Sequence, residues 1–198
     1  SLAEPAIAAA VRNGAEAIGD IELFARAARA PVVAITGANG KSTVTTLVGE
    51  MVRDAGFEVR VGGNLGTPAL DLLAESEPHF YVLELSSFQL ETTHSLNAAA
   101  ATVLNISPDH MDRYRDVQEY ASAKQRIYRG GGVMVINADD DYVAAMIEPG
   151  RKVVRFSLGE PKQDDFGIRE PQGYLCLAKG AEILLPANEL RIKGLHNI

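Results

Sequence analysis

Hydrophobic residues along the chain fall into short runs that predict strands alternating with helices. Four apolar runs have the length of buried strands, at residues 32–35, 80–83, 99–104 and 133–136. The stretch from Ser42 to about Ala55 instead carries its apolar residues at helical spacing, at Val44, Leu47, Val48, Met51 and Val52. Strands separated by helices predict an α/β fold with a doubly wound, mostly parallel sheet.

Weaker patterns add further expected elements. Helices are expected at residues 4–11, 20–28, 69–75 and 120–128, the second with Asp20 as its N-cap, and short strands at 15–18 and 57–61. After Pro149 the pattern changes to short alternating runs separated by Gly and Pro, at residues 153–156, 167–169, 174–177 and 182–185. These runs predict a small antiparallel sheet attached to the α/β core, with the lone cysteine, Cys176, as a buried sheet residue.

The first expected strand runs directly into the loop Thr36-Gly37-Ala38-Asn39-Gly40-Lys41-Ser42-Thr43, which opens the best-defined helix. The two glycines let backbone N–H groups turn around an anion, and the new helix adds its positive N-terminal end there. The lysine can reach the β- and γ-phosphates, and the hydroxyls can meet a phosphate-bound Mg²⁺. The common phosphate loop has a glycine at the position of Ile35, so this is a variant. An ordinary turn with a surface lysine is the alternative, but the flanking strand and helix favour a nucleoside triphosphate site.

Polar side chains also follow the other expected strands. Glu84, Asn105 and Asn137 each end an apolar run. Because the carboxyl ends of parallel strands share one edge of the sheet, we expect these residues beside the phosphate loop. Burying a carboxylate at the end of an apolar strand costs free energy unless a positive partner is close by. A phosphate-bound Mg²⁺ would be such a partner for Glu84. An acid at a helix N-terminus, paired with backbone N–H groups, is the alternative.

Two further candidates lie after the third strand run. His110 stands between Asp109 and Asp112, where it could ligate or orient a second metal, although a lone loop histidine is usually solvated. Lys124 lies on the helix expected at residues 120–128. Spacing alone predicts only a solvated surface lysine there.

Composition excludes several classes of protein. The net charge of −7 and the absence of a Lys/Arg cluster argue against a nucleic-acid surface. One cysteine excludes an internal disulfide and a cysteine-based zinc site. No apolar stretch approaches the ~20 residues of a membrane span, and no signal peptide is present in this sequence. We therefore expect a cytoplasmic protein, and a monomer because no heptad seam is visible.

The phosphate loop resembles that of the Mur ligases and folylpolyglutamate synthetases, a family of ATP-dependent amide-forming enzymes. The match extends to Gly62-Gly63-Asn64-Leu65-Gly66, to Glu84-Leu85-Ser86-Ser87-Phe88-Gln89-Leu90, to Asp109-His110-Met111-Asp112 and to Ala123-Lys124-Gln125-Arg126-Ile127-Tyr128. The Ser-Ser-Phe-Gln-Leu segment resembles the corresponding segment of the family member that adds D-glutamate to UDP-N-acetylmuramoyl-L-alanine. The resemblance implies a P-loop type of sheet and a reaction in peptidoglycan precursor synthesis, in which ATP converts the substrate carboxylate to an acyl phosphate that the D-glutamate amine attacks.

The resemblance also implies roles for individual residues. The nucleotide would be held by Gly37, Ala38, Asn39, Gly40, Lys41, Ser42 and Thr43, and its adenine by Asn197. Two Mg²⁺ ions are implied, with ligands among Thr43, Glu84, His110 and a carbamylated Lys124; Lys41, Glu84, His110 and Lys124 would carry the catalysis. Asn64, Ser86 and Gln89 match positions that line the muramoyl substrate.

The family has three domains, and this chain resembles the middle, ATP-binding one. We expect residues 1–19 to be a remnant of, or linker from, the domain that holds the uridine nucleotide, and residues 20–198 to be the ATP-binding domain, cut at its C-terminal end. The domain that binds D-glutamate is expected to be absent, so this fragment alone should not ligate. Two alternatives stay open: a ligase of the same family with a different acceptor, and a nucleotide-binding module without catalysis.

Overall fold

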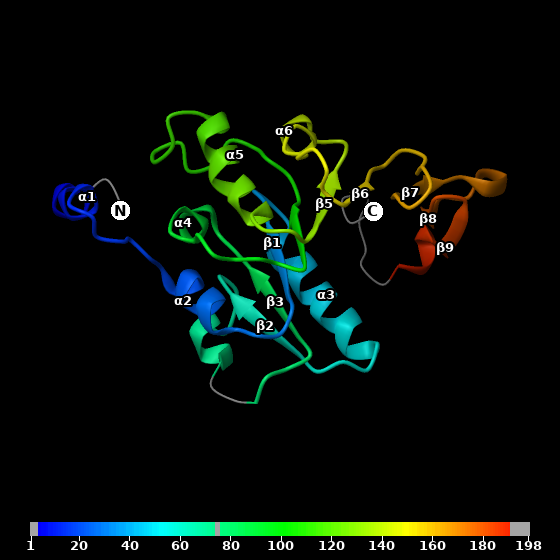
Figure 1. Cartoon of the computed structure of the whole chain (residues 1–198). Helices are drawn as coiled ribbons and strands as arrows, with labels where there is room; N and C mark the ends of the chain where they lie inside the picture. The colour runs from blue at the N-terminus through cyan, green and yellow to red at the C-terminus, as the bar shows by residue number, and fades with distance from the viewer. Residues whose placement is uncertain (1–3, 74–75, 191–198) are drawn as a thin grey trace.

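The strands in the described part of the chain form one continuous, nine-stranded sheet (Figure 1). In the computed structural model, which describes residues 4–73 and 76–190, the strand order is β2-β3-β1-β4-β5-β6-β7-β8-β9. The strands up to β6 are Val32–Thr36 (β1), Val59–Gly63 (β2), Phe80–Glu84 (β3), Ala100–Val103 (β4), Val133–Asn137 (β5) and Val153–Phe156 (β6). The last three are Phe166–Arg169 (β7), Cys176–Lys179 (β8) and Glu182–Pro186 (β9).

All pairings from β2 across to β7 are parallel, and only β7-β8-β9 are antiparallel. The expected α/β fold with an antiparallel extension is therefore confirmed. One strand was assigned to the wrong part, because β6 pairs in parallel with β5 and belongs to the doubly wound sheet. Residues 153–156 form a strand that is only partly buried, near the end of the parallel sheet. A partly buried strand can alternate between apolar and polar residues whether it is parallel or antiparallel, so the pattern does not indicate its direction.

Helices cover both faces of the parallel sheet. The longer ones are Asp20–Ala27 (α2), Lys41–Asp54 (α3) and Val117–Gln125 (α5), and the short ones are Ser87–Glu91 (α4) and Asp141–Ala144 (α6). A further helix, Pro5–Arg12 (α1), has no buried residue and lies apart from the sheet (Figure 1). Short 3₁₀ segments lie at Ala69–Leu73 (η1), Arg126–Tyr128 (η2), Pro171–Gly173 (η3) and Ala187–Glu189 (η4). No helix within residues 4–73 and 76–190 has the length and hydropathy needed to cross a bilayer.

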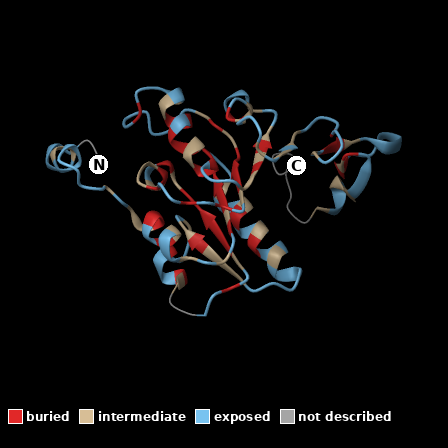
Figure 2. Cartoon of the chain, viewed as in Figure 1, coloured by how far each residue is buried: buried red, intermediate tan, exposed pale blue. Residues whose placement is uncertain are grey.

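The core lies in two layers, one on each side of β1, and the central strands of the sheet are the most continuously buried part of the chain (Figure 2). On one side, Ala34 and its neighbours pack against α2, α4, α5 and α6 in the larger cluster, where Phe24 meets Tyr81 edge to face at 4.9 Å. On the other side, Ile35, Val82 and Leu104 pack against α3. Successive residues of β1 thus face opposite layers, as expected for a strand buried on both faces.

Several expected elements differ in detail. Residues 15–18 form no strand, and the expected strand at 57–61 lies two residues later, in β2. The expected helix at 69–75 is the 3₁₀ segment η1, and its last two positions lie outside the described residues. Asp20 is the first residue of α2 and not its cap, because Gly19 occupies the cap without a side-chain bond.

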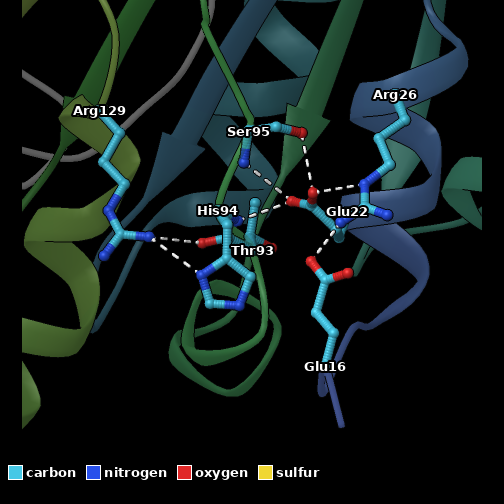
Figure 3. A network of polar contacts seen from close by, with 7 residues as sticks. All are labelled: Glu16, Glu22, Arg26, Thr93, His94, Ser95 and Arg129. Atoms are coloured by element: carbon cyan, nitrogen blue, oxygen red, sulfur yellow. Dashed lines mark hydrogen bonds and ion pairs between the residues drawn. The ribbon is translucent and has the colours of Figure 1, made fainter. Parts of the chain in front are cut away.

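Helix α2 is held to the loop after α4 by a buried carboxylate, that of Glu22 (Figure 3). Its Oε2 accepts from the backbone N–H groups of His94 at 2.7 Å and Ser95 at 2.9 Å. Its Oε1 accepts from Arg26 Nε at 2.7 Å and from Ser95 Oγ at 2.9 Å. Burial by itself raises the pKa of this carboxyl, but these hydrogen bonds outweigh it and lower the pKa from 4.5 to about 2.

We predict that Glu22→Gln lowers the free energy of unfolding by on the order of 2 kcal/mol. The amide NH₂ group would replace a carboxylate oxygen that accepts two hydrogen bonds, and it cannot accept them from the donors that remain in place. The control Glu16→Gln removes only an exposed ion pair with Arg26 and should cost less than about 1 kcal/mol. Urea denaturation of both variants and the wild type measures the difference.

The same measurement has an expected pH dependence. The folded-state pKa of Glu22 lies below its unfolded value, so its contribution is complete above about pH 4.5 and is lost as the pH falls toward about 2. The gap between wild type and Glu22→Gln should therefore narrow over that window. A gap that stays constant down to pH 2 contradicts the assignment.

Candidate functional site

The loop that the sequence predicts to bind phosphate joins β1 to α3 and is hydrogen-bonded to Asn105, just beyond the end of β4. Gly40 adopts a left-handed conformation, with φ 77°, at the cap position where α3 begins. Asn105 bonds the loop on both sides: its Oδ1 accepts from Asn39 N at 2.8 Å, and its Nδ2 donates to Asn39 O at 3.1 Å. The Asn105 carbonyl also accepts from Ala38 N at 3.0 Å. The sequence predicts Asn105 at this edge of the sheet but assigns it no role. In the structure its hydrogen bonds to Ala38 and Asn39 hold the loop in place.

Glu84 ends β3 beside this loop, and its carboxylate is buried. Its Oε2 accepts from Ser42 Oγ at 2.7 Å, and its Oε1 accepts from Asn64 Nδ2 at 2.8 Å. Thr43, the expected metal ligand, is the next residue on α3 and is exposed, and the hydroxyl that bonds Glu84 is that of Ser42. A hydroxyl and a carboxylate oxygen next to an anion-binding loop are the donors that Mg²⁺ prefers, and the residues fit that ion.

Asn64 reaches Glu84 because the chain turns sharply after β2. Gly63 has φ 99°, and a Cβ there would lie 2.4 Å from the Glu84 carbonyl oxygen. That oxygen accepts from Asn64 N at 2.8 Å. The close approach requires glycine, and it brings the expected substrate-lining asparagine to the end of β3.

Lys124 is buried, contrary to the surface position that spacing predicts for it. Only 1% of the residue is exposed, and its Nζ donates to the Gly37 carbonyl at 2.8 Å and to Thr36 Oγ1 at 3.3 Å. The Tyr120 ring centroid lies 4.6 Å from Nζ. A signal was present in the sequence: Tyr120, Lys124 and Tyr128 stand four residues apart, on the buried stripe of α5 and η2.

The surroundings of Lys124 favour its neutral amine. Burial is the main cause and the nearby Lys41 charge adds to it, and together they lower the pKa of Lys124 from 10.5 to about 7. Asp109 and Glu84 act in the opposite direction. The charges that act on Lys124 thus come from α3, from β3 and from the loop that carries His110.

His110 lies in the loop between β4 and α5, half exposed and with a left-handed φ of 55°. Its Nε2 is 3.5 Å from Asp109 Oδ2, and its ring packs 4.8 Å from that of Phe88. Within the described parts of the chain, no three His, Cys, Asp or Glu side chains converge tightly enough to hold a metal by themselves. A second metal at His110 therefore fits only if phosphate oxygens and a further ligand complete its shell.

Ser86 and Gln89, expected at the substrate, form a capping box at the start of α4. Gln89 Oε1 accepts from Ser86 N at 3.0 Å, and Ser86 Oγ accepts from Gln89 N at 3.2 Å. Gln89 Nε2 donates to Asp20 Oδ2 at 3.2 Å, which attaches α2 to the same helix. Lys41 Nζ, in turn, donates to the Ala38 carbonyl at 3.0 Å. Asn197 lies outside the described residues.

Comparison with known proteins identifies the family to which this chain belongs. Residues 35–198 match the family model described as the Mur ligase middle domain. The chain is 58% identical over 198 residues to UDP-N-acetylmuramoylalanine–D-glutamate ligase of Nitrosococcus oceani, and 60% identical over 188 residues to the ligase of the same name from Methylococcus capsulatus. These alignments cover 100% and 94% of this chain, but 44% and 40% of the relatives. The chain thus spans less than half the length of the curated relatives it matches.

A solved structure shows the same fold. The structure of a UDP-N-acetylmuramoyl-L-alanyl-D-glutamate–2,6-diaminopimelate ligase superimposes with a TM-score of 0.66 at 26% sequence identity. The match covers 83% of this chain and 40% of that one.

We predict that Lys124 titrates near neutral pH. In a sample with ¹³C-labelled lysine, the Cε resonance that disappears in Lys124→Met should titrate with a midpoint near pH 7 rather than 10.5. Because the folded-state pKa is the lower one, the free energy of unfolding should also fall as the pH drops from about 10.5 to about 7, and Lys124→Met should lack that component. Lys162→Met, at an exposed position, is the control. A midpoint above 10 contradicts the prediction.

Proposed function

The chain belongs to the Mur ligase family, and on that premise we propose that the intact protein is an ATP-dependent ligase that joins D-glutamate to UDP-N-acetylmuramoyl-L-alanine. The printed names of the most similar relatives support this choice of substrates, at 58% and 60% identity. The Ser86-Ser87-Phe88-Gln89 segment supports it from the sequence. That the intact protein is monomeric and cytoplasmic stays a prediction.

In this proposal residues 20–198 are the ATP-binding domain, and residues 1–19 lead into it from a domain that holds the uridine nucleotide. The amino-acid-binding domain is assigned to the part of the intact protein that corresponds to the remaining length of the relatives. The fragment supplies the phosphate-transfer site and does not ligate by itself. Asn197 is proposed to contact the adenine.

One observation carries the proposal: Glu84, Ser42 and the Lys124–Gly37 bond meet at a single anion-binding loop. Moving a phosphoryl group onto a carboxylate brings anions together, so the site must mainly position them and neutralise their charge. Backbone N–H groups from Gly37 to Thr43 and the Lys41 ammonium are proposed to hold the triphosphate. The substrate carboxylate oxygen then bonds to the γ-phosphorus as ADP leaves, and the amine nitrogen displaces phosphate from the acyl carbon.

Two Mg²⁺ ions are proposed, and they supply charge neutralisation of the phosphate oxygens when bound. Ser42, Thr43 and Glu84 would hold the first. His110 and a carbamylated Lys124 would hold the second. Asn64, just after β2, and Ser86 and Gln89, at the N-cap and in the first turn of α4, would line the muramoyl substrate.

The environment of Lys124 supports its carbamylation. A pKa of about 7 leaves roughly half of this amine neutral at pH 7, whereas an ordinary lysine is almost fully protonated. The neutral nitrogen attacks the carbon of CO₂, an N–C bond forms, one C=O electron pair moves to oxygen, and the nitrogen releases a proton. The product is an anion, which replaces a cation beside Gly37 with a group able to ligate metal.

We predict that Lys41→Ala in the intact protein lowers kcat/KM for ATP by at least about a hundredfold, because a charge aimed at the phosphates is lost. Lys152→Ala, an exposed lysine before β6, is the matched control and should leave activity unchanged. Phosphate release that depends on D-glutamate and on the nucleotide substrate is the measurement. Release with another amino acid would favour a different acceptor, and no release with any acceptor would favour a non-catalytic module.

We also predict a carbamate on Lys124. In the intact protein incubated with ¹³C-bicarbonate, a carbamate carbonyl signal should be present by NMR and absent from Lys124→Met. Activity of a Lys124→Ala variant should be lower by at least about a hundredfold, and short carboxylic acids that replace the carbamate should partly restore it. An unmodified Lys124 in a fully active protein contradicts this part of the proposal.

A further inference from the structure

Four side chains join α4 to the turn that carries His110, and the proposed function gives none of them a role. They are Phe88 and Glu91 from α4, and Arg113 and Tyr114 from the loop before α5. We call this group the α4 clamp. Phe88 stands in the middle of the Ser-Ser-Phe-Gln-Leu segment, yet it is 37% exposed, more than a core position requires.

Glu91 supplies the polar half of the clamp. Its Oε2 accepts from Arg113 Nη2 at 2.5 Å, and its Oε1 accepts from the Tyr114 hydroxyl at 2.6 Å. The same two loop residues close the turn at His110, because Arg113 N and Tyr114 N donate to the His110 carbonyl at 2.9 and 3.1 Å. Glu91 thus holds the turn through the residues that form it.

Phe88 supplies the aromatic half. Its ring centroid lies 4.8 Å from that of His110, and the Arg113 guanidinium carbon lies 4.4 Å from the Phe88 centroid. Tyr114 stacks on Phe88 at 6.2 Å with an interplanar angle of 15°. Arg113 is therefore shared by both halves, bonded to Glu91 and placed over Phe88.

His110 needs such support. A left-handed backbone is uncommon for residues other than glycine, although histidine adopts it more often than most, and the contacts around the turn help to hold His110 in it. Its contact with Asp109 is between two half-exposed side chains. The Tyr120 ring is further away, at 6.3 Å, which leaves Phe88 as the nearest aromatic surface against the imidazole.

We propose that Phe88 and Glu91 are positioning residues for His110: Phe88 fixes its ring and Glu91 fixes its turn, and together they set the affinity of the metal that His110 holds. The inference rests on the metal role of His110 in the proposed function. It has a structural consequence, because α4 also carries Ser86 and Gln89. The substrate-lining helix and the metal-binding loop then form one unit.

The test uses the intact protein with Mn²⁺ as the probe, in the presence of AMP-PNP. Electron paramagnetic resonance of free Mn²⁺ gives the number of bound ions and their affinities without any turnover. Phe88→Leu and Glu91→Gln should each weaken one of the bound Mn²⁺ ions about tenfold, as loss of a supporting partner typically does. Phe88→Tyr keeps the ring and should retain the wild-type affinity.

The matched control is Phe57→Leu. Phe57 is also a half-exposed phenylalanine beside a histidine, with its ring 5.9 Å from that of His79, but it lies two residues before β2, away from the clamp. This variant should bind Mn²⁺ like the wild type. Melting temperatures of all variants show which are folded, and Glu91→Gln tests the inference by itself if Phe88→Leu is not.

His110→Ala distinguishes a failure of this inference from a failure of the proposed metal role of His110. Mn²⁺ binding should weaken in this variant, and adding Phe88→Leu to it should weaken binding no further, because Phe88 acts through His110. Loss of Mn²⁺ affinity in His110→Ala but in neither clamp variant overturns the inference and leaves the proposed function standing. Unchanged binding in His110→Ala removes the metal role itself, and the inference with it.

Discussion

Strand β1 lies between β3 and β4, and all three run in the same direction, so that Thr36, Glu84 and Val103 reach one edge of the sheet together. The register is tight: Ile35 pairs with Glu84, and Thr36 with Val103. Every group of the candidate site depends on this pairing. A shift of one residue would turn Glu84 away from the loop and into an apolar layer.

The same edge concentrates charges of both signs in a small space. Lys41, Glu84 and Asp109 all act on the charge of the buried Lys124, and the two buried groups, Glu84 and Lys124, are each hydrogen-bonded to the loop at residues 36–43. Burying such groups is costly without partners, which explains why Ser42, Asn64 and the Gly37 carbonyl are all engaged. The low pKa of Lys124 follows from that burial, and its proposed chemistry with CO₂ follows from the pKa.

Helix α4 has only five residues, yet three parts of the chain meet on it. Asp20 of α2 bonds Gln89, Glu22 of the same helix holds the loop that follows α4, and Glu91 holds the turn at His110. A helix this short gains little from its own hydrogen bonds and is stabilised by its tertiary contacts. Its position, and that of the side chains it presents, is therefore set by α2 and by the His110 loop.

The sequence by itself determined the strand runs of the parallel sheet, the phosphate loop and the position of Glu84 at a strand end. These are local features, fixed by apolar periodicity and by the glycines of the loop. It did not determine the burial of Lys124, because spacing shows a stripe on a helix but not which layer covers it. The sequence assigned β6 to the antiparallel part, because an alternating pattern does not indicate the direction of a strand. It also predicted Asp20 as the N-cap of α2, whereas in the folded structure the Asp20 carboxylate accepts a hydrogen bond from Gln89. The sequence brought Glu84 and Asn105 to the edge of the sheet that holds the loop, but only the packed structure decided which atoms bond to one another, because partners such as Thr36 and Lys124 lie 88 residues apart in the chain.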